Sequence, residues 1–238
     1  MNLKLLEVMP DVHAGNGLGS VDRHELCVMA MCAAEARLRR GEPIGEATDQ
    51  CKCVSPVLRE LAIARNEAAW ESDESRTAWA LDLVPKLLGT YDDVRDVRRA
   101  AALARYSVRV IAAEALRSVR LLKEAERLAT LPEDVRLDVA EAAAQTAAQS
   151  AWAAESVRPA DAAQSVWTVE TSLASQIVAA TWTVDWTTGT TGAVWTVARA
   201  AENVTRAVEA ATRTAAPNAE AAYTAGLDEL LRIAMETE

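Results

Sequence analysis

Residues 95–110, RDVRRAAALARYSVRV, place charged and apolar side chains with the period of an α-helix. At 100° per residue, the arginines of this stretch and of its continuation fall within about a third of the helix circumference. They are Arg95, Arg98, Arg99, Arg105, Arg109, Arg117 and Arg120. The pattern predicts an amphipathic helix that begins at the acidic Asp92 and Asp93 and runs to about Ala129, with one arginine face and one apolar face.

Capping residues and helix breakers mark further helices before this stretch. Ser55 followed by Pro56 is typical of a helix start, Gly89 of a helix end, and Pro85 of a kink. The expected helices span residues 24–40, 55–70 and 75–88. Residues 1–22 are expected to form a poorly structured or strand-like lead-in that ends in the flexible loop GNGLGS.

The second half of the chain is rich in alanine, with 28 Ala among residues 140–225. Pro159, Gly189 with Gly192, and Pro217 divide it into four expected helices. Residues 181–197 could form a β-hairpin on propensity alone, but the strong helix formers on both flanks favour a helix.

Together these segments predict an all-α fold, a multi-helix bundle or helical array of about seven helices. Two regions are expected. Residues 1–130 hold a cysteine-containing loop and the arginine-rich helix, and residues 131–238 are rich in Ala, Trp and Thr. Trp152, Trp167 and Trp182 recur every fifteen residues, which is typical of a repeated helical packing unit.

The overall charge limits the classes of partner. A formal net charge of -10 and a pI of about 4.9 disfavour binding to duplex nucleic acid and to anionic lipid. No secretory signal is recognised at the N-terminus, and the longest charge-free stretch, Thr171–Val184, is shorter than the roughly 20 apolar residues of a membrane span. We therefore expect a cytoplasmic protein without a membrane partner.

Positive charge is concentrated in the arginine-rich segment. Residues 95–127 carry nine Lys and Arg against four Asp and Glu, whereas the rest of the chain carries 16 against 31. Guanidinium groups bind phosphate and carboxylate through paired donors. The hypothesis is that this face binds an anion through Arg95, Arg98, Arg105, Arg109 and Arg117. The alternatives are a solvated helix face, or arginines that pair with acidic groups of the chain itself.

Metal binding and catalysis have little support in the sequence. The candidate ligands are Cys27, Cys32, Cys51, Cys53, His13 and His24. On one helix Cys27 and Cys32 would point about 140° apart, and Cys-x-Cys is not a typical structural zinc pair. Buried, inert thiols are the favoured interpretation. No nucleophile motif is present, so we assign no metal, cofactor or catalytic residue, and enzyme activity is not expected.

The Trp-rich region carries very little charge, with five charged residues between Ala142 and Ala198. A surface helix normally has a charged face. The region therefore predicts either a buried central helix or a subunit interface, most simply in a two-fold homodimer. The expected interface residues are Trp167, Trp182, Trp186 and Trp195.

Three stretches resemble a known group of proteins: CKCVSPVLREL, LDLVPKLLGT and the Ala/Trp-rich stretch. They are similar to uncharacterised alanine- and tryptophan-rich helical proteins of high-GC bacteria and their phages. The chain departs from that group by replacing the regular charged Ala/Trp array with Thr and Val. The resemblance implies an all-helical fold and a phage or mobile-element origin, in which case the host-cell cytoplasm would be its location. It implies no mechanism.

Two functional hypotheses follow. The first is a non-catalytic binding protein that captures an anionic small molecule or an acidic protein surface through the arginine-striped helix, with sequestration as its role. The alternative is a self-assembling structural subunit, such as a virion component or scaffold, that associates through the charge-poor half. Anion capture should weaken as ionic strength rises, whereas an apolar interface should not.

Overall fold

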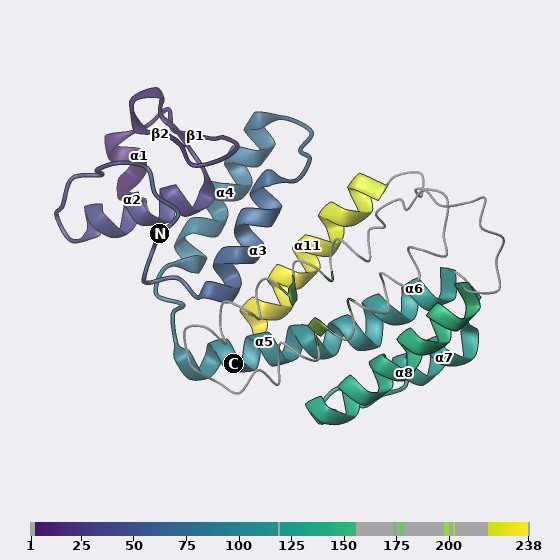
Figure 1. Cartoon of the computed structure of the whole chain (residues 1–238). Coiled ribbons are helices and arrows are strands. Elements are labelled where there is room, and N and C mark those ends of the chain that lie inside the picture. The colour runs from purple at the N-terminus through teal and green to yellow at the C-terminus, as the bar shows by residue number, and fades with distance from the viewer. Residues whose placement is uncertain are drawn as a thin grey trace. The chain divides into compact units, whose positions relative to one another are not determined.

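The computed structural model describes residues 3–118, 120–155 and 219–237, and the single positions 174, 177, 178, 198, 199 and 202. The chain divides into two compact units, Met1–Asp96 and Val97–Glu238. The boundary lies in the first turn of α5 (Asp93–Tyr106), whereas the sequence placed it near residue 130. The described elements are mostly helices, so the predicted all-α class is confirmed (Figure 1). No helix within the described ranges is long and apolar enough to span a bilayer.

The first unit combines helices with a small sheet. Its elements are α1 (Lys4–Val8), β1 (His13–Ala14), β2 (Gly19–Ser20), η1 (Val21–Arg23), β3 (Glu25–Leu26), α2 (Val28–Arg39), α3 (Pro56–Glu67) and α4 (Asp73–Leu87). The strand order is β1-β3-β2, and β3 pairs parallel with β1 and antiparallel with β2.

This sheet corrects the expectation of a flexible GNGLGS loop. Gly19 of that motif lies in β2 with a φ of +78°, and a Cβ atom there would lie 2.0 Å from the carbonyl oxygen of Glu25. Only glycine fits so close to β3. The two-residue strands and the five-residue α1 are too short to leave a periodic signal, so the sequence indicated a strand-like lead-in without its helix.

α2 forms the core of the first unit. Every side chain from Val28 to Glu35 is buried, and the helix contacts α1, α3 and α4. The carboxylate of Glu35 accepts hydrogen bonds from the backbone N–H of Leu5 and from Nε of Arg39, each at 2.8 Å. A buried charge is tolerated when it is paired in this way.

α2 begins four residues later than predicted. His24 has a left-handed backbone, with a φ of 53°, and therefore cannot continue a helix. Cys27 is the N-cap, and its Sγ accepts a hydrogen bond from the N–H of Ala30 at 3.3 Å. The Cys27 side chain thus takes the place of the usual serine or aspartate cap, which the sequence analysis did not anticipate.

The predicted helix start at Ser55 and helix end at Gly89 are confirmed. The Oγ atom of Ser55 caps α3, with Pro56 in its first turn. α4 starts with a capping box between Ser72 and Ser75, so its cap lies three residues before the predicted start. Gly89 follows α4 with a φ of 78°, which is the conformation typical of a glycine after a helix.

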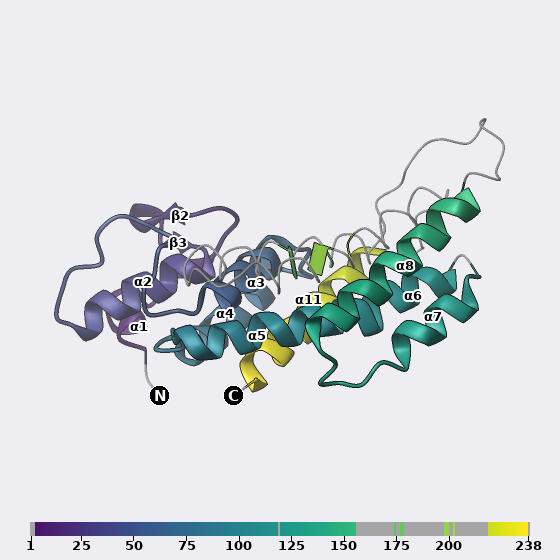
Figure 2. The same cartoon turned by 60° about the horizontal axis from the view of Figure 1, so that its bottom comes forward.

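The second unit contains α5, the π-helical segment η2 (Ser107–Ala112), α6 (Ala113–Ser118), α7 (Leu122–Ala129), α8 (Leu137–Glu155) and α11 (Ala219–Glu236). Both views show α7 alongside α6, and α8 alongside α7 (Figures 1 and 2). The two helices pack back on the arginine-rich segment by turning their apolar faces toward it, with Ala125, Leu128 and Ala140 buried.

The prediction of one helix running to Ala129 is wrong. The chain reverses at Arg120, which has a left-handed backbone with a φ of 64°. The N–H of Arg120 bonds to the carbonyl of Arg117, and the N–H of Leu121 bonds to the carbonyl of Leu116, both at 3.0 Å. This is the Schellman helix end. No glycine marks it, because an arginine occupies the position where glycine is usual.

Several predictions for the second half lie outside the described residues. α8 and α11 are helical as expected, and the described Ala174, Ile177 and Ala198 are buried. The helix or hairpin at 181–197, and the Trp167, Trp182, Trp186 and Trp195 interface, fall in segments of which nothing is described.

Candidate functional site

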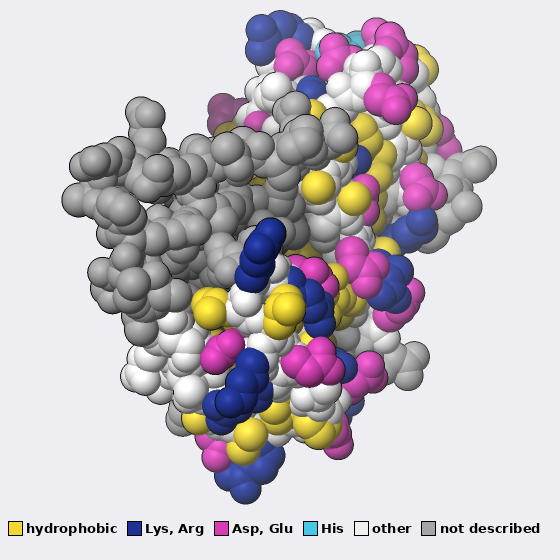
Figure 3. All heavy atoms as spheres, turned by 90° about the vertical axis from the view of Figure 1, so that its right-hand side faces the viewer, with side chains coloured by type: hydrophobic (Ala, Val, Ile, Leu, Met, Phe, Trp, Pro, Cys, Tyr) yellow, Lys and Arg dark blue, Asp and Glu magenta, His cyan; other side chains and the backbone are white. Residues whose placement is uncertain are grey.

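The arginines of the predicted face differ in exposure and in their partners. Arg95 and Arg98 are exposed, whereas Arg99 is 3% exposed and donates from Nε to the carbonyl of Ala234 at 3.1 Å. Arg117 forms an ion pair with Glu114, one helical turn before it. On the face drawn in Figure 3, basic and acidic side chains of the described residues are interspersed.

Two arginines of the predicted anion site bind the protein's own backbone. Arg105 Nε donates to the carbonyl of Val135 at 2.9 Å, and Arg109 Nε donates to the carbonyl of Leu131 at 2.8 Å. Arg109 NH2 also lies 3.7 Å from a carboxylate oxygen of Glu133. Both side chains therefore hold the connection between α7 and α8. From the sequence, pairing with acidic groups of the chain was one alternative to anion binding. Here the two arginines do bind their own chain, but mainly at backbone carbonyls.

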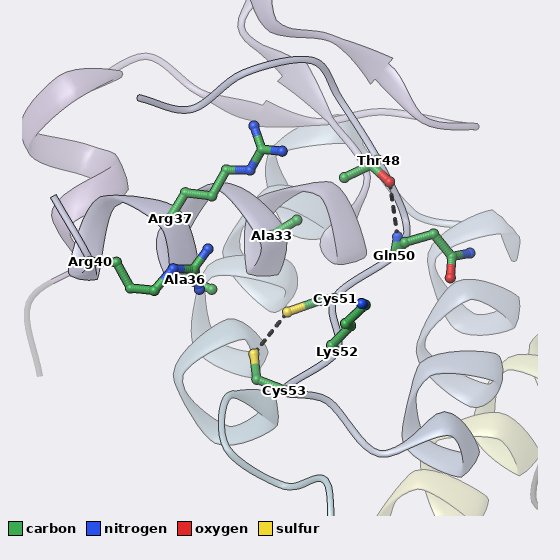
Figure 4. A pocket seen from close by; sticks show the side chains of 9 residues that line it. All are labelled: Ala33, Ala36, Arg37, Arg40, Thr48, Gln50, Cys51, Lys52 and Cys53. Carbon is green, nitrogen blue, oxygen red and sulfur yellow. Dashed lines mark hydrogen bonds between the residues drawn. The ribbon is translucent and has the colours of Figure 1, made fainter. Parts of the chain in front are cut away.

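The first unit contains a basic pocket that was not predicted from the sequence. A cavity of about 490 Å³ lies between the C-terminal half of α2 and the loop of residues 48–53 (Figure 4). It is lined by Ala33, Ala36, Arg37, Arg40, Thr48, Gln50, Cys51, Lys52 and Cys53. Three of these nine residues are cationic and none is acidic. The signal in the sequence was the two segments RLRRGEP and DQCKC, whose Arg37, Arg40 and Lys52 were assigned to no site.

The three cations of the pocket differ in how many hydrogen bonds they donate to other groups of the chain. Arg37 NH1 donates to the carbonyl of Ile44 at 3.0 Å, which holds the loop after α2. Arg40 donates from Nε and NH2 to the carboxylate of Glu42 at 2.8 and 2.9 Å. This pairing raises the pKa of Arg40 and lowers that of Glu42. Lys52 is exposed, and it makes no hydrogen bond or ion pair with any part of the chain that the structure describes.

Two thiols form one wall of the pocket. The sulfur atoms of Cys51 and Cys53 lie 2.8 Å apart, within hydrogen-bonding distance. Burial, and then the hydrogen bond with Cys53, raise the pKa of Cys51 to about 12. Burial also raises the pKa of Cys27, and it raises that of Cys32 further. These three thiols therefore stay protonated at neutral pH.

The described residues bring two of the candidate metal ligands, Cys51 and Cys53, into contact. Among the described residues, no three His, Cys, Asp or Glu side chains are grouped closely enough to hold an ion. His24 instead pairs with Asp11 at 2.5 Å, and the hydrogen bond from His24 lowers the pKa of Asp11. Cys27 is committed to capping α2.

A second cluster in the first unit is aromatic. The rings of Trp70 and Trp79 lie 5.1 Å apart, and the guanidinium carbon of Arg65 is 3.5 Å from the centre of the Trp70 ring. Arg65 is buried, so this cation–π contact stabilises the end of α3 against α4 and does not face a ligand.

No protein-family model, no curated protein and no solved structure matches the chain. The resemblance to alanine- and tryptophan-rich phage and bacterial proteins therefore stays a prediction.

Proposed function

We propose that this protein is a non-catalytic binding protein that takes a small phosphate- or carboxylate-bearing ligand in the pocket between α2 and residues 48–53. The observation that carries the proposal is the lining of that pocket, with Arg37, Arg40 and Lys52 and no acidic residue. A cavity of about 490 Å³ falls within the range of small-molecule sites.

The chemistry of the lining residues suits an oxyanion. Lys52 offers an ammonium group without a partner in the described chain, and Arg40 keeps NH1 beyond the two nitrogens that bind Glu42. The Thr48 hydroxyl also lines the cavity; it accepts a hydrogen bond from the N–H of Gln50 at 3.1 Å and keeps its own O–H to donate. Gln50 adds no free group, because its amide donates to Asp49 and accepts from Arg59. Charge-assisted hydrogen bonds from such groups contribute about 1.5–3 kcal/mol each.

The proposal moves the anion site from the arginine face of α5 to the first unit. Arg105 and Arg109 have their Nε donors occupied by carbonyl oxygens of the chain. A ligand would have to compete with those bonds, whereas at Lys52 it competes only with water. The acidic partner surface of the original hypothesis becomes the second choice, because a concave pocket of about 490 Å³ suits a small molecule better than a protein face.

The biological setting belongs to the same proposal. The resemblance to phage and bacterial proteins supports an accessory role in which the ligand is held without turnover, in the host-cell cytoplasm. Self-assembly as a virion component or scaffold is the second candidate, and the observation that favours it is the presence of only five charged residues between Ala142 and Ala198.

The test is titration calorimetry at low ionic strength with inorganic phosphate, citrate and ATP as probes. We expect one of them to bind, and we expect Lys52→Gln and Arg40→Gln each to weaken binding about tenfold or more. Lys86→Gln is the matched control, because it removes the same charge from an exposed position of α4 that does not line the pocket.

Two outcomes would overturn the proposal: no probe binds at low salt, or Lys52→Gln and Arg40→Gln bind as tightly as the unchanged protein. Arg98→Gln, measured in the same titration, tests the α5 hypothesis directly. If Arg98→Gln weakens binding and Lys52→Gln does not, the ligand site lies on α5.

A further inference from the structure

The cysteine pair of the pocket is arranged for a reaction of its own. Cys51 and Cys53 are separated by one residue in a turn closed by a hydrogen bond from the N–H of Val54 to the carbonyl of Cys51 at 3.0 Å. This turn brings the two side chains to the same side of the loop, where their sulfurs face each other (Figure 4).

Little movement separates this arrangement from a covalent bond. The sulfurs are 2.8 Å apart, and the sulfurs of a disulfide are about 2.05 Å apart, so closure requires an approach of about 0.8 Å. The turn is anchored on its far side, since the carbonyl of Cys53 accepts a hydrogen bond from the N–H of Tyr91 at 3.2 Å. The approach can therefore occur through side-chain rotation, without displacing the start of α3.

The pocket gives reagents access to this pair and not to the other thiols. Both Cys51 and Cys53 line the cavity, and Cys53 is the more exposed of the two. Cys27 and Cys32 are buried in α2 and its cap, and neither lines the cavity. A small thiol reagent in the pocket would therefore meet Cys53 first and Cys51 second.

We propose that Cys51 and Cys53 are a redox site that forms a reversible disulfide by exchange with a low-molecular-weight disulfide such as glutathione disulfide. The Cys53 thiolate attacks one glutathione sulfur, and the other glutathione leaves as a thiolate that takes up a proton. Cys51 then loses its proton and attacks the Cys53 sulfur, which releases the second glutathione. The protein loses two protons and two electrons, and one glutathione disulfide becomes two glutathione thiols.

The surroundings of the pair favour this exchange over irreversible oxidation. The positive charge of Arg40 acts on Cys51 and opposes part of the effect of burial on that thiol. Arg37 and Lys52 line the same cavity, so an anionic reagent such as glutathione disulfide is attracted to it. Cys51 lies 2.8 Å from Cys53 and is therefore placed to act as the resolving thiol for a mixed disulfide on Cys53. The inference does not depend on the ligand of the pocket.

The test is a thiol count across a series of glutathione buffers, from fully reduced to strongly oxidising. The full-length protein is equilibrated, quenched with acid, denatured and alkylated with N-ethylmaleimide, and its mass is measured. All four cysteines are free thiols in the structure. We expect two of the four to be lost together at oxidising ratios, and the peptide that contains Cys51 and Cys53 to become two hydrogens lighter.

Matched variants identify the residues. Cys53→Ser should form no internal disulfide and should instead retain a glutathione adduct on Cys51 or stay reduced. Cys27→Ser is the control, because serine is a good N-cap for α2 and should leave the exchange unchanged. If Cys53→Ser does not fold, as judged by circular dichroism, Cys51→Ser serves in its place. Four free thiols at every ratio, a persistent mixed disulfide in the unchanged protein, or a disulfide that involves Cys27 or Cys32 would each overturn the inference.

Discussion

Arg105 and Arg109 should stabilise the second unit by holding the connection between α7 and α8. Each donates from Nε to a backbone carbonyl of that connection, Arg105 to Val135 and Arg109 to Leu131. A hydrogen bond from a charged donor contributes about 1.5–3 kcal/mol when it is desolvated. The Arg109 side chain is 23% exposed, so water screens part of the interaction, and we take about 1–2 kcal/mol for each bond.

The double variant Arg105→Ala with Arg109→Ala should therefore lower the free energy of unfolding by about 2–4 kcal/mol. Urea denaturation followed by circular dichroism measures this loss. Hydrogen exchange of the peptide over residues 130–136 measures the local effect. Its backbone N–H groups should exchange faster, because the connection is held less firmly once its carbonyls lose the two arginine donors. Arg127→Ala is the matched control, since Arg127 is exposed on α7, and it should change stability by no more than about 0.5 kcal/mol.

The reasoning fails if the double variant unfolds within about 0.5 kcal/mol of the unchanged protein and exchange over residues 130–136 is unaltered. That result would mean that Arg105 and Arg109 are free to bind something else. It would return them to the anion-binding role that their spacing in the sequence suggested.

Three further outcomes can be checked. Arg120→Gly should raise stability by about 0.5–1 kcal/mol, because glycine relieves the left-handed backbone at the end of α6, and unchanged or lower stability in urea would contradict this. The rate at which iodoacetamide alkylates Cys51, measured by peptide mass, should rise about tenfold per pH unit from pH 7 to 9. The reason is that a pKa of about 12 keeps the thiolate fraction of Cys51 small over this range. A rate that does not change with pH would count against that pKa. If the charge-poor half is an interface, light scattering at tens of micromolar should give a dimer mass that does not fall at high salt, and a monomer would leave the buried-helix interpretation.

Features that depend on neighbouring residues could be predicted from the sequence. Ser55 starts α3 because its hydroxyl oxygen accepts a hydrogen bond from the N–H of Leu58 at 3.4 Å, and Leu58 is only three residues further along the chain. Gly89 ends α4 because only glycine adopts its backbone conformation without a steric cost. The alanine-rich α8 and α11 form helices for a similarly local reason, since alanine has the highest helix propensity.

The arginine face shows where such local reasoning stops. Its period predicted a helix correctly from Asp93, but the periodicity continued through Arg120, where the chain reverses. The chain leaves one helix at Arg120 and enters the next at Leu122. So short a break leaves the order of charged and apolar side chains almost the same as in one long helix. The turn is stable because α7 packs back against α6, and that contact is between helices rather than within one.

Only the tertiary structure decided what the functional side chains meet. The acceptors of Arg105 and Arg109 are backbone carbonyls 30 and 22 residues away, and every residue has such a carbonyl, so no residue type marks them in the sequence. The basic pocket likewise depends on the loop of residues 48–53 folding back beside α2. The sequence alone determined the charge, the helical composition and the helix signals at Ser55 and Gly89, because these act over three or four residues. The acceptors of Arg105 and Arg109 and the basic cavity were decided by packing between segments that are distant along the chain.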